Sequence, residues 1–277
     1  MSPLKASEIE AIEFDLLLEA ISRRYGHDFR NYARASVERR IRQYLMKTDC
    51  SRVSEIIPKI LYNEDFFEDF VTRFSIPVTE IFRDPFVYRS IREKVVPILK
   101  TYPFIRIWHA GCASGEEAYS LAILLKEEGM YGKTTFFATD FNDVLLQTAK
   151  EGIYDLRNVQ QFTRNYQQAG GKGSFSEYYH AQYDAIMIDS ALKRNITFAN
   201  HNLVTDSVFT EAHFILCRNV LIYFNKTLQN QTLRLFRDSL VRGGFLCLGT
   251  KESLQFSDVQ KDFKVVDERA RIYQKRL

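Results

Sequence analysis

Apolar residues in the first 75 positions recur at the three- and four-residue spacing of helices. In the stretch NYARASVERRIRQYLMK, one stripe is formed by Ala33, Val37, Ile41, Tyr44 and Leu45,. The stretch FFEDFVTRF repeats the pattern on a smaller scale, and no alternating strand pattern occurs before residue 100,. The N-terminal part of the chain is therefore predicted to be all helical.

The pattern changes after residue 103, where short apolar runs alternate with helical ones. Strand patterns cover residues 105–111, 134–140, 196–203, 213–219 and 245–250, and helical patterns cover residues 116–129, 142–152 and 226–244. Strand and helix alternate at the spacing of parallel crossovers, which predicts a doubly wound, mostly parallel α/β sheet. The final run DFKVVDERARIYQKRL alternates over two short stretches and favours a closing antiparallel hairpin,.

Residues 155–195 interrupt this alternation with glycines, tyrosines and short alternating runs. Such a segment is typical of a small antiparallel β insert at the rim of a sheet. The sequence thus predicts a helical domain over residues 1–85 and a sheet domain over residues 86–277, with the insert at about 155–195.

Composition is that of an ordinary globular protein, with 277 residues, 45% hydrophobic and 26% charged,. The net charge of +3 gives no reason to expect nucleic acid or an anionic membrane as a partner,. The chain starts without the layout of a secretion signal and has no apolar run of membrane-spanning length, so a cytoplasmic protein without membrane insertion is predicted,. The four cysteines and the histidines lack metal-ligand spacing, so no metal site is expected,.

Positive charge is concentrated in one segment of the predicted helical domain. Between Arg23 and Lys59, ten Lys and Arg stand against four Asp and Glu. Arg39, Arg40 and Arg42 lie beside or opposite the apolar stripe. Charge runs of this kind usually form a solvated helix face, but they can also attract an acidic partner.

The residues that follow the predicted strands form a candidate site, because ligands of wound sheets bind past the carboxyl ends of the strands. These residues are Gly111 with Glu116 and Glu117, Asp140, Asn202 with Leu203, and Arg218 with Asn219. Asp140 is placed where an acid commonly binds ribose hydroxyls. Asn202 can offer its amide to a base edge while Leu203 packs on the ring. A nucleoside ligand is therefore predicted.

The charge of this ligand follows from the stretch GCASGEE, residues 111–117. It lacks the G-x-G-x-x-G spacing that lets a backbone approach a pyrophosphate, and its glutamates would repel phosphate,. The stretch AGGKGS is no P-loop, because Gly173 follows Lys172 where Ser or Thr is needed,. S-adenosylmethionine carries two positive charges and no phosphate, which suits Glu116 and Glu117. The helix dipole alone would also favour acids there.

Six stretches together resemble the CheR family of chemotaxis-receptor methyltransferases, in its order and near its spacings. They are VTEIFRDP, IWHAGCASGEEAYSLAILL, FATDFN, NHNL, CRNVLIYF, and GGFLCLG with ESL. The N-terminal YARASVERRIRQYLM is similar to the helical domain of that family. The resemblance spans nearly the whole chain. It implies a Rossmann-like methyltransferase sheet that uses S-adenosylmethionine and releases S-adenosylhomocysteine.

The resemblance also implies the reaction and the residues that perform it. The reaction is methyl transfer to a glutamate side chain of a chemoreceptor, giving a methyl ester. The residues implied to contact the cofactor are Thr79, Arg83, Glu117, Asp140, Asn202, Leu203, Asn219 and Val220. Charge agrees with two of these assignments, because Arg83 can pair with the carboxylate of the cofactor and Glu117 with its ammonium.

The acceptor glutamate has a reference pKa of about 4.3, so it is ionised at neutral pH and needs no general base. The protein is then expected to align the reacting groups and exclude water. Tyr223 is our candidate for a catalytic group near the methyl, where its hydroxyl would orient the carboxylate; the alternative is that Tyr223 only packs. Arg83 is the second residue predicted at the catalytic centre.

The expected partner is the cytoplasmic helical bundle of a chemoreceptor, with Arg39, Arg40 and Arg42 as its docking residues. In some members of the family the β insert grips the tail peptide of a receptor by adding a strand, which makes residues 155–195 a second candidate contact. No nucleic acid partner is expected, and the chain is predicted to be a monomer.

Some positions depart from the family pattern. Pro77 replaces a usual Asn, His213 replaces a frequent Asp, and Thr250 with Lys251 replaces a His-Ser pair. The main alternative function is an S-adenosylmethionine-binding signalling module with little or no transferase activity. A methyltransferase of small molecules is disfavoured, because the basic helical domain suits a protein surface.

Overall fold

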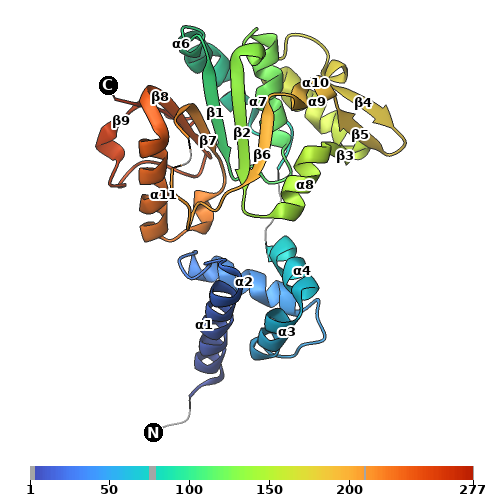
Figure 1. Cartoon of the computed structure of the whole chain (residues 1–277), viewed down its shortest axis with the longest axis vertical. Helices are drawn as coiled ribbons and strands as arrows, with labels where there is room; N and C mark the ends of the chain where they lie inside the picture. Colours follow the sequence, from blue (N-terminus) through green and yellow to red (C-terminus); the bar gives the residue numbers. More distant parts are fainter. Residues whose placement is uncertain (1–3, 75–78, 209, 277) are drawn as a thin grey trace. The chain divides into compact units, whose positions relative to one another are not determined.

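The computed structural model describes residues 4–74, 79–208 and 210–276. The chain forms two compact units (Figure 1). The first, here the helical unit, comprises Met1–Ile76 and Ile222–Gln229, and the second, here the sheet unit, comprises Pro77–Leu221 and Asn230–Leu277.

The division after Ile76 differs from the predicted boundary after Pro85. Residues 79–85 belong to the sheet unit because they bond to its first long helix and its strands: Phe82 N donates to Ser120 Oγ at 2.7 Å, and Arg83 O accepts from Arg218. The segment Ile222–Gln229, which was predicted in the sheet domain, belongs to the helical unit.

The helical unit confirms the all-helical pattern of the N-terminal part. Its helices are α1 Ala6–Tyr25, α2 Arg34–Leu45, η1 Val53–Glu55, α3 Ile56–Tyr62 and α4 Glu64–Phe74. Helix α1 ends at Gly26, whose φ of 74° favours glycine,. The apolar faces of these helices meet in a core that includes Leu17, Ile41, Ile60 and Phe70. Among the helices that the structure describes, none has the length and hydropathy needed to span a bilayer.

The predicted positive segment is neutralised by acids of α1. Arg30 pairs with Glu19 at 2.7 Å, Arg34 pairs with Asp15, and Arg42 pairs with Glu10 at 2.9 Å. Residues 1–76 contain 12 Lys and Arg against 13 Asp and Glu. The prediction of a strongly basic helical domain is therefore wrong, because it counted charges along one segment and missed the acids that fold against it.

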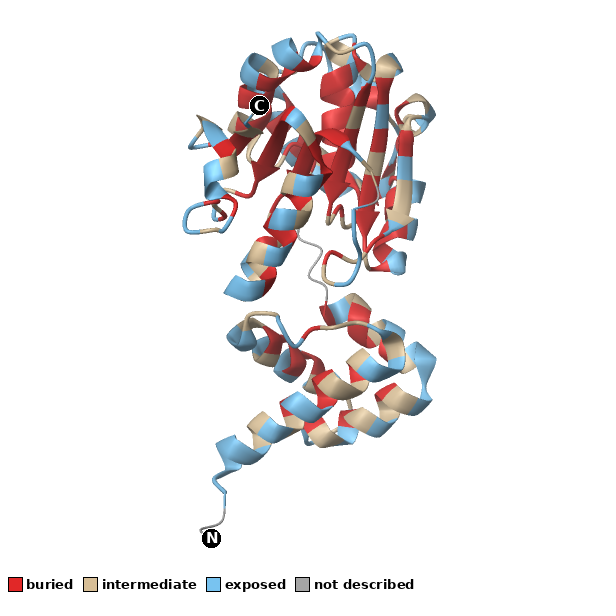
Figure 2. Cartoon of the chain, turned by 60° about the vertical axis from the view of Figure 1, so that its left-hand side comes forward, coloured by how far each residue is buried: buried red, intermediate tan, exposed pale blue. Residues whose placement is uncertain are grey.

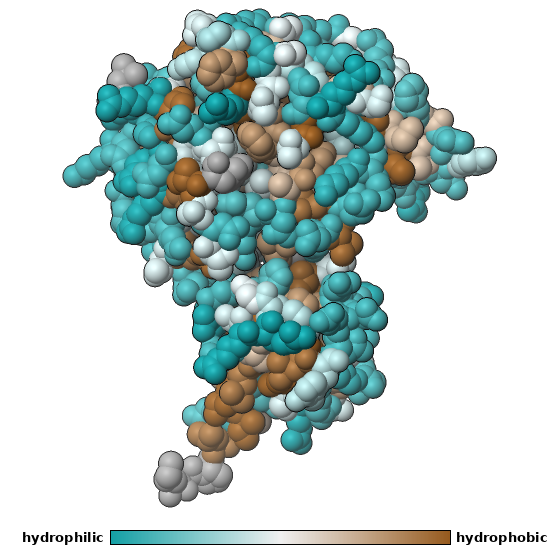
Figure 3. Space-filling model, viewed as in Figure 1, coloured by the Kyte–Doolittle hydropathy of each residue, from teal (hydrophilic) through white to brown (hydrophobic). Residues whose placement is uncertain are grey.

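Helix α1 also presents apolar side chains to solvent. Ile9, Ile12 and Leu16 of the helix, and Leu4 just before it, are each about half exposed, between 47% and 55%. The space-filling view shows these hydrophobic residues gathered along α1 (Figure 3). The helix is therefore apolar on two faces, of which one packs in the core.

The sheet unit is built on a seven-stranded sheet of order β6-β2-β1-β7-β8-β10-β9. Its strands are β1 Ile105–Ala110, β2 Thr134–Asp140, β6 Ile196–Asn200, β7 Ala212–Cys217, β8 Leu240–Leu248, β9 Phe263–Asp267 and β10 Ile272–Lys275. The first five in the spatial order are parallel, and β10 pairs antiparallel with both β8 and β9. This confirms the predicted sheet and its closing hairpin.

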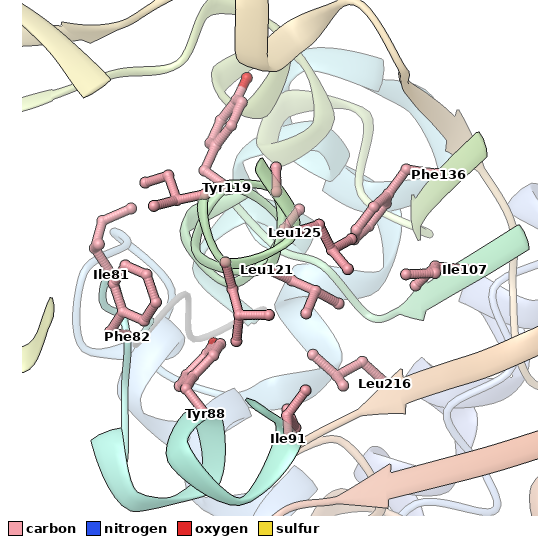
Figure 4. Packing of buried hydrophobic residues seen from close by; sticks show 14 of the residues in the cluster. Ile81, Phe82, Tyr88, Ile91, Ile107, Tyr119, Leu121, Leu125, Phe136 and Leu216 are labelled. Atoms are coloured by element: carbon pink, nitrogen blue, oxygen red, sulfur yellow. The ribbon is translucent and has the colours of Figure 1, made fainter. Parts of the chain in front are cut away.

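Helices flank this sheet and bury most of its strands (Figure 2). Their bounds are α5 Pro85–Ser90, η2 Ile91–Val95, α6 Val96–Leu99, α7 Glu116–Glu127, η3 Tyr131–Lys133, α8 Asp143–Glu151, α10 Ser190–Lys193 and η7 Gln260–Asp262. Helix α11 Lys226–Ser239 belongs to this unit from Asn230 onward, and η6 Leu221–Tyr223 spans the point where the two units divide. Helix α7 is central to the core. Figure 4 shows it between Ile107 and Leu216 of the strands and Phe82 and Tyr88 of the preceding segment.

The predicted insert is a separate three-stranded antiparallel sheet of order β3-β5-β4. Its elements are β3 Ile153–Asp155, η4 Leu156–Asn158, α9 Val159–Gln168, η5 Phe175–Tyr178, β4 Tyr179–Gln182 and β5 Ala185–Ile188. Helix α9 was not predicted. Its buried residues Phe162, Asn165 and Tyr166 recur at helical spacing, which the tyrosine and glycine content of the segment obscured.

The stretch AGGKGS has a packing role in this insert. A Cβ on Gly171 would lie 2.2 Å from the ring of Tyr166, so only glycine fits there. Lys172 N donates to Glu127 of α7 at 3.0 Å, and Gly173 N donates to the Tyr166 hydroxyl at 2.8 Å. The loop therefore ties the insert to the end of α7.

Candidate functional site

The carboxyl ends of five parallel strands lie along one edge of the sheet. The register pairs Ala110 of β1 with Thr139 of β2, and Asp140 of β2 with Asn200 of β6. On the other side of β1, strands β7 and β8 end together at Cys217 and Leu248. The loops after these strands hold nearly all the residues that the sequence predicted for a nucleoside site, and together they form the strand-end site.

The loop after β1 begins with a turn that requires glycine. Gly111 has φ 74°, and a Cβ at this position would lie 2.5 Å from Cγ2 of Val220. Gly111 N donates to Thr139 O at 2.8 Å, which holds the turn against β2. The loops after β1 and β7 therefore touch at Gly111 and Val220, two residues that were predicted to bind the cofactor.

Asp140 ends β2 and organises the same loop. Its carboxylate accepts from Ala113 N at 2.9 Å and from Asn142 N at 3.1 Å. Burial raises the pKa of Asp140, while these backbone donors act to lower it,. Because a carboxylate has about four acceptor positions, Asp140 retains capacity for the hydroxyls of a ribose.

Glu117 is a buried, ionised carboxylate in the first turn of α7. Its Oε1 accepts from Arg218 and from the Tyr88 hydroxyl at 3.3 Å, and its Oε2 lies 3.8 Å from His109 Nε2. Burial alone would raise the pKa of Glu117, but the charge of Arg218 and the nearby His109 ring outweigh burial and lower it to about 2,. Glu117 is thus negatively charged at neutral pH.

Glu116, its neighbour, has the opposite character. Its Oε2 accepts from the Ser114 hydroxyl at 2.7 Å, with no cation paired to it among the described residues. Burial raises the pKa of Glu116 to about 7, and Ser114 only partly offsets this,. The two glutamates, which the sequence treated as equivalent, therefore differ in charge, and Glu117 is the one suited to an ammonium group.

Arg218 connects three parts of the site, a role that was missed from the sequence. Its side chain is fully buried and pairs with Glu117 and with Asp84, the latter at 2.5 Å. Its Nη1 also donates to Arg83 O at 3.2 Å. A charged residue directly after a buried strand could have indicated this role, but its partners are more than a hundred positions away in sequence. Arg218 fixes the segment of Arg83 to α7 and β7.

The backbone around the site is strained. Phe82, Asp84, Ala113 and Asn219 have φ values of 53°, 55°, 47° and 62°, a region that residues with a Cβ rarely adopt,. Each such residue costs on the order of 1 kcal/mol or more and persists only where its surroundings fix it. These four positions flank Arg83, Gly111 and Val220, which is the pattern expected of a functional site.

Two of the predicted cofactor residues carry buried polar atoms without a partner among the described residues, namely Thr79 Oγ1 and Asn219 Oδ1. An unsatisfied buried polar group costs about 1–3 kcal/mol, so native chains rarely keep one without a ligand or water to pair with it. The residues of the site thus fit a polar cofactor such as S-adenosylmethionine.

Asn202 and Leu203 follow β6 as predicted. Asn202 Oδ1 accepts from Val204 N at 3.0 Å, which fixes the side chain and leaves its amide NH2 group to donate,. Leu203 is buried, with 7% of its surface exposed. A donor beside an apolar side chain can bind the edge and the face of an adenine base.

The predicted catalytic and docking residues of the helical unit have three different environments. Tyr223 is partly buried under the guanidinium of Arg40. Arg40 is itself buried, which excludes it from an exposed docking surface. Arg42 is exposed but paired with Glu10 and Glu38, and Arg39 is exposed. The prediction of three equivalent docking arginines is therefore wrong for Arg40, because it lies on the buried face of α2.

The departures from the family pattern are mostly structural. His213 Nδ1 accepts from Arg106 N at 3.1 Å, which joins the starts of β7 and β1. Thr250 and Lys251 form a turn after β8, and Pro77 lies outside the described residues. Cys217 is fully buried in β7, and burial raises its pKa, as expected of a core cysteine.

Two protein families match the chain. The family described as "CheR methyltransferase, SAM binding domain" matches residues 77–272, and "CheR methyltransferase, all-alpha domain" matches residues 12–75. The first range covers the strand-end site, and the two ranges meet where the two structural units divide.

Individual relatives match over nearly their full length. A Pseudomonas putida protein with the name "Putative methyltransferase Cher3" is 47% identical, over 95% of this chain and 97% of the relative. A "Chemotaxis protein methyltransferase" of Listeria innocua is 29% identical, over 84% of this chain and 87% of the relative. "Chemotaxis protein methyltransferase 1" of Vibrio cholerae is 28% identical, over 92% of each chain.

Proposed function

Because the chain belongs to the CheR methyltransferase family, we propose that it transfers a methyl group from S-adenosylmethionine to glutamate side chains of chemoreceptors. The products are a glutamate methyl ester and S-adenosylhomocysteine. The observation that carries the proposal is the strand-end site, which combines an ionised, buried Glu117 with polar atoms of Thr79 and Asn219 that have no partner among the described residues. The names of the relatives in Listeria and Vibrio support a role in chemotaxis.

Each residue of the strand-end site has a role in holding the cofactor. Glu117 pairs with the ammonium of the methionine part, and Arg83 pairs with its carboxylate. Asp140 accepts from the ribose hydroxyls, and Asn202 with Leu203 binds the base. Gly111 lets Val220 of the loop after β7 approach the loop after β1, and Thr79, Asn219 and Val220 line the remaining surface. Glu116 is only partly ionised at neutral pH, because its pKa is raised to about 7.

The bound cofactor supplies an electrophilic methyl group on a positively charged sulfur. The acceptor glutamate, with a reference pKa of about 4.3, arrives ionised, so no residue of the chain has to remove a proton. The contribution of the protein is to orient the two groups in line and exclude water, which can be worth roughly 7–11 kcal/mol in favourable cases. In this mechanism the hydroxyl of Tyr223 donates to the acceptor carboxylate and orients it.

The docking surface for the receptor bundle is the exposed face of α2. Arg39 and Gln43 of α2 and Lys47, two residues past its end, recur at four-residue spacing, and all three are exposed,. Arg42 adds area but little free charge, because Glu10 and Glu38 neutralise it. This face replaces the larger set of arginines expected from the sequence.

The insert is the second proposed contact with the receptor. Strand β4 is an edge strand of the small sheet and pairs with β5 on one side. An edge of this kind can accept an extended tail peptide as a further strand. We place the protein in the cytoplasm as a monomer, where the receptor bundle is accessible.

The test is transfer of labelled methyl from S-adenosylmethionine to membranes that contain chemoreceptors. The proposed reaction predicts label on the receptor that is released by mild base, as expected of an ester. The competing function, a cofactor-binding signalling module, predicts cofactor binding without labelled receptor. Label that resists base would indicate a different acceptor group.

A further inference from the structure

Arg40 is buried in the helical unit, with 6% of its surface exposed. Its Nη1 donates to Phe74 O at 2.8 Å, and its guanidinium lies over the ring of Tyr223, 4.1 Å from the ring centroid. Its Nε and Nη2 are buried and have no hydrogen-bond partner among the described residues. Burying unpaired donors of a cation is unfavourable for folding, so stability does not explain this placement.

The neighbouring arginines of α2 show what an ordinary arrangement looks like. Arg42 uses the same edge, Nε and Nη2, to hold both carboxylate oxygens of Glu10 at 2.9 Å. Arg39 is exposed to solvent. Arg42 also lies over an aromatic ring, that of Phe14, but it is exposed and paired with acids. Arg40 differs because it is buried, lies over the rings of Tyr223 and Phe74, and has no acid paired with it among the described residues.

The segment that contains Tyr223 is fixed to the same unit on both sides of the ring. Ala33 N donates to Tyr223 O at 2.7 Å, and Asn225 N donates to Asn31 O at 2.9 Å. Tyr32 and Phe224 form an isolated antiparallel bridge, with their ring centroids 5.0 Å apart. The backbone of Tyr223 is therefore held by hydrogen bonds, while Arg40 covers the face of its ring.

The position of Tyr223 in the sequence ties this arrangement to the cofactor residues. Tyr223 follows Val220 by three peptide bonds, so their Cα atoms cannot be more than about 11 Å apart. Any contact that fixes the ring of Tyr223 therefore acts close to a residue that the proposed function assigns to the cofactor.

We infer that Arg40 is a positioning residue for methyl transfer, which holds the ring of Tyr223 by a cation–π contact, and that it is not a docking residue. The inference rests on the proposed function, in which the Tyr223 hydroxyl orients the acceptor carboxylate. A guanidinium is attracted to the negative face of an aromatic ring and stacks on it in a defined plane. Small errors in the position of such a group can lower a rate by about 100-fold.

The test compares R40A with R39A, a matched change one residue away on the same helix. R40A is expected to lower kcat for receptor methylation about 10- to 100-fold with little change in KM. R39A is expected to raise the KM for receptor, and more so at low salt, because Arg39 is a docking residue. R40K keeps a cation over the ring without the planar contact, so it should recover part of the lost kcat.

A double-mutant cycle with Y223F tests whether Arg40 acts through Tyr223. Without the hydroxyl, the position of the ring no longer matters for the reaction. R40A should then lower kcat by less than about threefold in the Y223F background. The inference would be overturned if the loss of kcat in the double mutant equalled the product of the losses in R40A and Y223F. It would also be overturned if R40A changed KM alone.

One measurement is independent of turnover and separates this inference from the proposed function. The aromatic NMR resonance of Tyr223, identified by its loss in Y223F, is expected to shift in R40A and to stay in place in R39A. An unshifted resonance in folded R40A overturns the inference even if the wild-type chain methylates receptors. A wild-type chain that transfers no methyl refutes the proposed function, and the NMR result then decides the contact by itself.

Discussion

Arg218 in the sheet unit and Arg40 in the helical unit are both buried, but they differ in what surrounds their positive charge. Arg218 pairs with the carboxylates of Glu117 and Asp84, so its charge is balanced where it lies. Arg40 contacts a carbonyl oxygen and a ring, and its Nε and Nη2 have no hydrogen-bond partner in the described part of the chain, whereas Arg218 has only its Nε in that state. A buried cation with balanced charge is part of the architecture, whereas one without such balance indicates a function that the fold alone does not require.

Replacement of Arg218 should have the largest effect on stability. R218M leaves Glu117 and Asp84 without their cation, and removing one partner of a buried pair costs about 3–5 kcal/mol,. Urea unfolding at pH 7 measures this loss. Because Arg218 helps to lower the pKa of Glu117 to about 2, the loss should shrink as pH falls below the unfolded value of 4.5,.

The control for this prediction is R234M. Arg234 pairs with Asp258, but its side chain is 53% exposed. Surface pairs contribute at most about 1 kcal/mol, so R234M should unfold nearly as the wild type does. Equal losses for R218M and R234M would contradict the distinction between a buried and a surface pair.

Replacement of Glu116 should have the next largest effect on stability, and above pH 7 it should stabilise the fold where the loss of Arg218 destabilises it. The folded pKa of Glu116 is raised to about 7 from 4.5, so its ionisation destabilises the fold as pH rises through this range,. E116Q cannot ionise, and its amide oxygen can still accept from Ser114. The free energy of unfolding of E116Q minus that of the wild type should therefore rise by roughly 3 kcal/mol between pH 4 and pH 8.

This difference is read from urea unfolding of both chains at several pH values. Glu117 is not expected to give such a pH-dependent difference, because it stays ionised in the folded chain throughout this pH range. A pH-independent difference between E116Q and the wild type would mean that Glu116 is not a buried group with a raised pKa.

The smallest effect on stability is expected for Arg40, and it sharpens the comparison with Arg218. R40M replaces a buried cation that has no acid paired with it among the described residues by an apolar side chain of similar length, so the free energy of unfolding should change by less than about 1 kcal/mol, or increase,. Thermal or urea unfolding of R40M beside R218M measures this. A loss of 3 kcal/mol or more would show that the charge of Arg40 is needed for folding.

The strand-end site could be predicted because the local sequence pattern shows where each parallel strand ends. Gly111 and Asp140 follow alternating apolar runs, and crossover connections bring the ends of such strands to one edge,. No long-range contact had to be known. The prediction of cofactor residues therefore follows from the order of strands and helices, together with the family resemblance.

The arrangement of charge could not be predicted in the same way. The partners of Arg218 are contributed by the segments at Asp84 and Glu117, and only the folded chain brings them together. The burial of Arg40 did have a local indication, since Arg40 falls three residues after Val37 and four before Tyr44, in the apolar stripe of α2,. An arginine at such a position was taken for a surface residue because arginine is seldom buried.

The central claim is that the strand-end site holds S-adenosylmethionine, and calorimetric titration of the wild type and T79V with S-adenosylhomocysteine tests it most directly. The hydroxyl of Thr79 is buried without a partner in the described part of the chain, so it should gain one when the ligand binds. T79V is expected to bind about tenfold more weakly, while the ligand-free chain is about 1 kcal/mol more stable than the wild type. Absence of binding heat in the wild type, or equal affinity in T79V, would contradict the account.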